Sequence, residues 1–228
     1  MPSPDHHRTG RSVSVAQLGA RMHYAVPLLL ERAGMLQHLY TDAFIGRTAV
    51  ALGTLIPPLL RPSALRRLLG RSCSLPPHRV TSFFSMGLAY RWKCQTARNR
   101  SDLTAAYLWA GDTFDRLIIR RGGPHCRTLY GFHSASLELF RHCRQRGIRC
   151  VLEQTIAPRR IVENIFSLEA RSWPGWEPEE HDSLATAYSE REAAEWDLAD
   201  VLIAASDYVA QTLASCGVHP SRCRIVPY

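Results

Sequence analysis

Short apolar or β-branched runs alternate with helical patterns along most of this 228-residue chain. Strands are predicted over 12–17, 35–40, 128–132, 148–154, 200–205 and 222–227, and helices over 23–33, 103–120, 134–146, 158–172, 183–198 and 206–216. Such alternation is typical of an open parallel sheet with crossover helices. We therefore predict an α/β fold, a Rossmann-like open parallel sheet with helices on both faces.

Local signals set the ends of these elements. Gly34, Gly147 and Gly217 each follow a predicted helix, where glycine commonly ends one, and Ser206 is placed to cap the last helix. The stretch 41–77 is irregular and broken by prolines, but Ser63–Arg71 within it can form a short basic amphipathic helix. We expect residues 1–10 to be disordered and residues 11–228 to form one domain.

Composition excludes several classes of protein. No uncharged apolar run approaches the roughly 18–20 residues of a membrane-spanning helix, and the first residues lack the apolar core of a secretory signal. We therefore expect a cytoplasmic protein. The seven cysteines form no C-x-x-C pair and the ten histidines are scattered, so we expect buried thiols and no metal site.

The positive charge is carried almost entirely by arginine. The net charge is +8, and Lys93 is the only lysine. Arginine suits phosphate recognition because its planar fork donates two hydrogen bonds to one anion. Charge alone allows nucleic acid, anionic lipid or nucleotide phosphate as partners, but no RRM, KH, zinc-finger or helix-turn-helix pattern supports nucleic acid.

Four strand ends carry polar residues that can meet a ligand, because ligands of open α/β sheets lie beyond the carboxyl ends of the strands. The candidates, in chain order, are Gly19 with Arg21, then His133, then Glu153 with Gln154, and finally Ser206. Glu153 can accept bonds from sugar hydroxyls or orient His133. Each candidate can instead have a purely structural role. In the same order, these roles are an ordinary turn, a structural histidine, a surface or capping carboxylate, and a helix cap.

Other motifs are absent or have simpler interpretations. The turn after the first strand is not G-x-G-x-x-G, and the residues around His133 do not match G-x-S-x-G. Two acidic helix faces, Glu163/Glu169 and Glu190/Glu192/Glu195, are predicted to be solvated or paired with Arg191 and its neighbours.

The last forty residues carry a resemblance to a known family. The run over 190–228, EREAAEWDLADVLIAASDYVAQTLASCGVHPSRCRIVPY, resembles the end of the N-terminal domain of family 4 glycosyltransferases. In that family, a helix carries a glutamate seven residues before an Ala-Asp pair and leads to an apolar strand that ends in serine. A helix, a glycine and a final strand then follow. The matching residues are Glu192, Ala199, Asp200, Ser206, Leu213, Gly217, Arg222 and 225–228.

The resemblance implies one half of a GT-B fold, in which two Rossmann-like domains face each other across a cleft. It implies metal-independent, retaining transfer of a sugar from a nucleoside-diphosphate sugar to a glycan or lipid-linked acceptor, with no cofactor. This chain would supply the acceptor-side domain, and the C-terminal donor domain would be missing, in cis or in trans. We expect the chain to be inactive alone.

The resemblance also assigns roles to the candidate residues. Gly19 would approach the donor phosphates, with Arg21 as a substitute contact because Ala20 stands where the family often has a second glycine. His133 would face the reacting sugar as the catalytic residue and, with Glu153 and Gln154, would bind the acceptor. Ser206 would contact the donor.

Two rival functions and one further contact remain open. The chain can be a non-catalytic carbohydrate-binding module, or a subunit that takes its donor domain from a second chain. An oxidoreductase or hydrolase is disfavoured by the missing glycine fingerprint and nucleophile elbow. The helix predicted over Ser63–Arg71 can hold the protein at the inner face of the cell membrane, or it can simply pack on the sheet.

Overall fold

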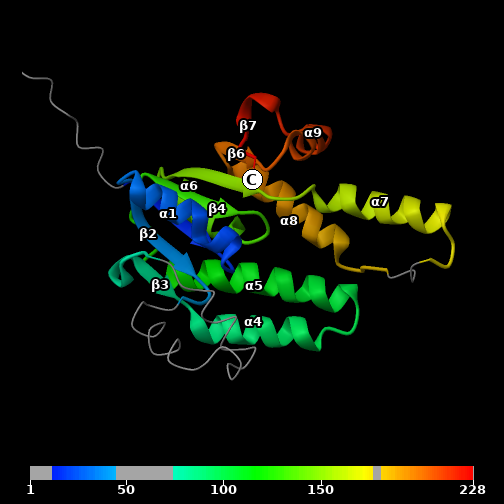
Figure 1. The fold of residues 1–228 in the computed structure, drawn as a ribbon, viewed down its shortest axis with the longest axis horizontal. Coiled ribbons are helices and arrows are strands. Elements are labelled where there is room, and N and C mark those ends of the chain that lie inside the picture. Colours follow the sequence, from blue (N-terminus) through cyan, green and yellow to red (C-terminus); the bar gives the residue numbers. More distant parts are fainter. Residues whose placement is uncertain (1–11, 45–73, 177–180, 228) are drawn as a thin grey trace, which may run out of the picture.

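The protein is an open sheet of seven parallel strands with helices packed around it (Figure 1). The computed structural model describes residues 12–44, 74–176 and 181–227. The strand order is β3-β2-β1-β4-β5-β6-β7, and every neighbouring pair is parallel. The predicted α/β class, a Rossmann-like open parallel sheet, is confirmed.

The strands are short, and all except β3 are close to the predicted ranges. They are β1 (Val13–Gln17), β2 (Leu36–Thr41), β3 (Val80–Ser82), β4 (Thr128–Phe132), β5 (Arg149–Gln154), β6 (Val201–Ala204) and β7 (Cys223–Ile225). The helices are α1 (Ala25–Arg32), α4 (Phe84–Thr96), α5 (Arg100–Arg120), α6 (Leu137–Arg144), α7 (Arg159–Ser172), α8 (Ala185–Leu198) and α9 (Asp207–Ser215). Short 3₁₀ turns lie at Arg21–Tyr24, Pro77–Arg79 and Pro220–Arg222.

The chain winds in two opposite directions from the middle of the sheet. From β1 it steps to β2 and then to β3, whereas from β4 it steps the other way to β5, β6 and β7. Because βαβ crossovers are right-handed, α1 lies on one face and the helices after β3 lie on the other. Both faces carry helices, as predicted, and the change of direction falls between β1 and β4.

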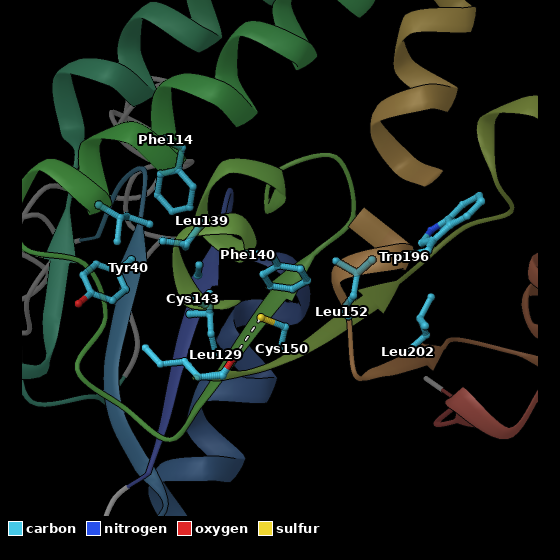
Figure 2. Close-up of a cluster of buried hydrophobic side chains, with 14 of the residues drawn as sticks. Tyr40, Phe114, Leu129, Leu139, Phe140, Cys143, Cys150, Leu152, Trp196 and Leu202 are labelled. Atoms are coloured by element: carbon cyan, nitrogen blue, oxygen red, sulfur yellow. Dashed lines mark hydrogen bonds between the residues drawn. The ribbon is translucent and has the colours of Figure 1, made fainter. Parts of the chain in front are cut away.

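The larger core lies between the sheet and helices α5, α6 and α8 (Figure 2). Leu129, Leu152 and Leu202 extend from three adjacent strands onto this face and are fully buried. The helices contribute Phe114, Leu139, Phe140 and Trp196. A smaller cluster under α1 contains Val15, Tyr24, Leu36, Leu39 and Phe132. Burial of one such side chain stabilises the fold by roughly 1.5–3 kcal/mol.

Several predicted helix ends are confirmed, and two elements were missed. Gly34, Gly147 and Gly217 all have positive φ, and the Ser206 hydroxyl accepts a hydrogen bond from the Val209 amide at 3.2 Å. Strand β3 has only three residues, and of α4 only Met86 is buried, so neither shows clear periodicity. The predicted disordered start and the predicted helix over Ser63–Arg71 lie outside the described residues.

Within the described ranges, no helix combines the length and the hydrophobicity needed to cross a bilayer.

Candidate functional site

The candidate site lies where β1, β4 and β5 end side by side. Strands β1 and β4 are paired neighbours although they belong to opposite windings of the sheet. The loops after them leave in opposite directions, so this carboxyl edge is a switch point of the kind at which open α/β sheets bind ligands. Of the predicted residues, the structure brings Arg21, His133 and Glu153 to this place.

A strained turn presents Arg21. Gly19 has a φ of 76°, and Met22, His23 and Tyr24 have φ of 47°, 51° and 63°. Residues that carry a Cβ rarely adopt this left-handed conformation. Tyr24 is fully buried, and its hydroxyl donates to the Ala43 carbonyl at 2.6 Å. This anchor holds the turn against the sheet edge.

The amide of Gly19 already has an anionic partner. It donates a 2.9 Å hydrogen bond to Oδ1 of Asp42, a buried residue directly after β2. A donor phosphate at Gly19 would have to share this amide with a carboxylate. Sequence reasoning missed Asp42 because nothing around it forms a motif.

Most N–H groups of the Arg21 guanidinium make no hydrogen bond within the described residues. The guanidinium donates to the Thr155 hydroxyl at 3.0 Å and lies 5.3 Å from the centre of the Phe132 ring. Burial lowers the pKa of Arg21, and the carboxylate of Glu153 opposes that shift. No ion pair of Arg21 exists within the described residues. A partly buried guanidinium of this kind suits an anionic or oxygen-rich ligand.

His133 lies beside Arg21 and is almost fully buried, with 4% of its surface exposed. Burial, reinforced by the positive charge of Arg21, lowers its pKa to about 3, so the imidazole is neutral near pH 7. Its Nδ1 lies 3.4 Å from both the amide nitrogen and the hydroxyl of Thr155. With Nδ1 accepting from the Thr155 amide, the ring proton is assigned to Nε2, which can donate to a ligand oxygen.

Thr155 therefore joins the two predicted residues. Its hydroxyl contacts both Arg21 and His133 and its amide contacts the imidazole, so one short side chain links the ends of β1, β4 and β5. Sequence reasoning gave it no role. Its position directly after β5, next to two chosen residues, was the signal that could have identified it.

The Glu153 side chain is hydrogen-bonded to Tyr130 and not to His133, which the sequence offered as one of its possible partners. Its Oε2 accepts a 2.6 Å hydrogen bond from the Tyr130 hydroxyl, and burial raises the pKa of the carboxyl. Glu153 is paired in register with Phe132, so its side chain lies on the α1 face. It does not orient the His133 ring; the two residues share only the main-chain bond from the His133 amide to the Glu153 carbonyl, at 3.0 Å.

The side chain of Gln154 is fully occupied inside the protein. Its amide nitrogen donates to Glu192 and to the Ile156 carbonyl, each at 3.1 Å, and its oxygen accepts from the Trp196 indole at 3.1 Å. The residue has no exposed surface. In this arrangement Gln154 ties β5 to α8 and presents no free polar atom to an acceptor.

Glu192 and Glu195 were predicted to be solvated or paired with Arg191 and its neighbours. Neither is solvated, and Glu195 lies 3.6 Å from the Arg191 guanidinium, which confirms the second alternative for this residue. Both are buried on the inner side of α8. Glu195 accepts hydrogen bonds from the amides of Ser134 and Ser136, at 2.6 and 3.0 Å, and Glu192 accepts from the amide of Arg159 at 2.7 Å. Burial raises the pKa of Glu192 to about 7 and that of Glu195 to about 8. Helix α8 thus holds the loops that follow β4 and β5.

The remaining predicted residue lies further along the same edge. Ser206 follows β6, one strand beyond β5, and its hydroxyl caps α9. The group at the switch point is therefore Arg21, His133 and Thr155, with Glu153 and Tyr130 on the α1 side and α8 supporting the loops.

The fold and this edge define a Rossmann-like α/β protein with a polar group of side chains at the switch between β1 and β4. No protein-family model matches the sequence, and no curated protein matches it.

Solved structures similar to this chain include three UDP-N-acetylglucosamine 2-epimerases. Those from Rickettsia bellii and Methanocaldococcus jannaschii are each 9% identical over 94% of this chain, with TM-scores of 0.42 and 0.40. That from Neisseria meningitidis, bound to UDP-GlcNAc, is 8% identical over 93% of this chain, with a TM-score of 0.38. The matched region spans only 44–45% of those chains. Similarity this distant assigns no substrate.

Proposed function

We propose that this chain is the acceptor-side domain of a GT-B glycosyltransferase, of the kind found in family 4. The full enzyme transfers a sugar, with retention, from a nucleoside-diphosphate sugar to a glycan or lipid-linked acceptor. A donor domain, in cis or in trans, completes the active site. The observation that carries the proposal is the chain of contacts from Arg21 through Thr155 to a neutral His133 at the switch between β1 and β4.

Each member of this group has a use in sugar transfer. A retaining transfer needs positive charge near the leaving diphosphate and a fixed acceptor hydroxyl near the anomeric carbon. Arg21 supplies a cation with unused donors, and a neutral imidazole donates from Nε2 to a sugar oxygen without competing for protons near pH 7. Tyr130 and Glu153 offer a second pair of polar groups on the neighbouring face. The C-terminal resemblance over 190–228 supports the same family.

The proposal is tested in an enzyme completed with its donor domain. His133→Ala should lower kcat by roughly 10²–10⁴-fold, the usual effect of removing a group that acts on a reacting hydroxyl. His23→Ala is the matched control because His23 is exposed in the nearby turn. It should keep activity within a few-fold. Equal turnover in the His133→Ala variant, with its fold intact by circular dichroism, would remove His133 from the site.

The rival function is a non-catalytic carbohydrate-binding module, and binding measurements on the 228-residue chain separate the two. We expect only weak binding of nucleoside-diphosphate sugars by calorimetry, because most donor contacts would lie in the second domain. Arg21→Ala should weaken it further. Micromolar or tighter binding of a plain glycan, unaffected by Arg21→Ala and His133→Ala, would favour the binding module instead.

A further inference from the structure

Helix α7 has no buried residue along its fourteen positions (Arg159–Ser172). It extends away from the sheet, and the loop 173–176 lies at its far end (Figure 1). Most residues of its second half are exposed, as are both tryptophans that follow it. A helix with so little buried surface contributes little to the core. Its exposed apolar side chains therefore indicate an interaction outside the core.

The inner side of α7 is already accounted for. Glu163 forms a 2.6 Å ion pair with Arg100 of α5, and the Phe166 ring lies 4.7 Å from the same guanidinium. These positions are three residues apart and share one face of the helix. They dock α7 on the start of α5.

The outer side of α7 is apolar. Ile165 and Leu168, again three residues apart, point away from the Glu163–Phe166 face, and they are 42% and 56% exposed. Trp173 and Trp176 continue this apolar surface past the end of the helix, with 61% and 85% of their surfaces exposed. We call these four residues the α7 tip.

One cation flanks the α7 tip. Arg160 and Arg171 are both exposed and, eleven residues apart, lie on the same flank of the helix. Arg160, however, is in the first turn and donates to the Ser215 carbonyl of α9 at 3.4 Å, so only Arg171 lies beside the tip. Within the described residues neither forms an ion pair, and Glu169 lies on the opposite flank. Acidic residues also follow at 177, 179 and 180 of the sequence. We therefore expect apolar contact, not net charge, to be the main attraction that this surface offers. The Arg171 guanidinium adds donors suited to phosphate oxygens.

We propose that the α7 tip is a membrane-docking surface that inserts Trp173, Trp176, Ile165 and Leu168 at the level of phospholipid headgroups. Helix α7 projects from the body (Figure 1), so its end can reach a flat bilayer. Tryptophan is favoured at this depth because its ring is apolar and its N–H is polar. Arg171 would bind a headgroup phosphate. The proposal does not depend on the glycosyltransferase assignment.

Vesicle flotation with the full chain tests this surface. The protein should float with phosphatidylcholine vesicles, and more of it should float when phosphatidylglycerol is included. Trp173→Ser/Trp176→Ser should lower the partition coefficient by on the order of tenfold. Arg171→Gln should remove the preference for phosphatidylglycerol but keep the binding to phosphatidylcholine.

The matched control is Trp92→Ser on α4, because Trp92 is 63% exposed, close to the 61% of Trp173, but lies on another helix. It should leave the partition coefficient within about twofold of the parent. Failure of the parent chain to bind either vesicle, or equal losses in Trp92→Ser and the double variant, would overturn the proposal. So would self-association in solution that the double variant abolishes without any vesicle binding. Trp176→Ser alone serves if circular dichroism shows that the double variant is unfolded.

Discussion

Three consecutive residues with side chains, Met22, His23 and Tyr24, adopt left-handed backbone angles in the turn that presents Arg21. Such a conformation costs roughly 1–2 kcal/mol per residue and persists only where the surroundings fix it. The Tyr24 side chain fixes one end by burial. Gln17 fixes the other, because its amide donates to the carbonyls of Gly19 and Arg21 at 3.1 and 3.2 Å.

Replacing His23 with glycine should therefore stabilise the protein. Glycine adopts a φ of 51° without a Cβ penalty, and the His23 side chain is exposed, so little contact is lost. We expect the free energy of unfolding in urea to rise by about 0.5–1 kcal/mol. Gln95→Gly, at an exposed position in α4, should lower it by about 1 kcal/mol. A loss of stability in both variants would contradict the strain at residue 23.

At the scale of elements, sequence periodicity predicted the strands and the helices that bury one face. Strand β4 was predicted at its observed bounds, Thr128–Phe132, because its apolar residues are bounded by clear turns. The same reasoning left two environments open for the glutamates of α8, solvated or paired with Arg191 and its neighbours. Glu195 does lie near Arg191, but Glu192 and Glu195 are buried and accept hydrogen bonds from backbone amides that only the folded loops bring there. Side-chain partners that distant segments provide leave no periodic signal.

The candidate site was predictable only as a set of strand ends. The rule that ligands meet parallel strands at their carboxyl ends selected Arg21 and His133, which the structure places together. It could not give the face of each side chain. Glu153 and His133 lie on opposite faces because their strands pair in register, and a one-residue difference in register would have reversed this outcome.

Close contact between α5 and the loop after β4 makes a second element-scale prediction. A Cβ on Gly111 would lie 2.2 Å from the Ser134 carbonyl oxygen, inside the loop that carries His133. Helix propensity alone predicts that Gly111→Ala gains about 1 kcal/mol. We expect instead a loss of about 1–3 kcal/mol in urea denaturation, because the helix or the loop must shift. A stabilised variant would show that the two elements are packed less closely.

At the scale of the whole molecule, a charge cluster lies inside the larger packed face. Arg191 pairs with Glu138 at 2.6 Å and lies 3.7 and 3.6 Å from Asp115 and Glu195, so three carboxyl groups surround one cation. Burial raises the pKa of Asp115 as well as that of Glu195. The folded protein thus binds protons that the unfolded chain releases near pH 4–5.

Stability should therefore fall as the pH rises through the neutral range. A carboxyl whose pKa is about 8 when folded contributes its full stabilisation below the unfolded pKa, and loses it progressively up to and through pH 8. The glutamine in the Glu195→Gln variant cannot ionise. The free energy of unfolding of this variant should therefore decline less than that of the parent between pH 5 and pH 9, whichever of the two proteins is more stable. Glu190→Gln, exposed on the same helix, should retain the slope of the parent. Parallel slopes in all three proteins would contradict a buried, neutralised Glu195.

The pairing of β1 with β4 also has a consequence for how the chain folds. Val13 lies opposite Thr128, so this contact closes a loop of more than a hundred residues. The strands from β4 to β7 are joined by much shorter connections and can form before that loop closes. Arg21 and His133 lie at the end of this long-range contact. A ligand that bridges the candidate site would therefore also stabilise the pairing of β1 with β4, the contact that closes the long loop.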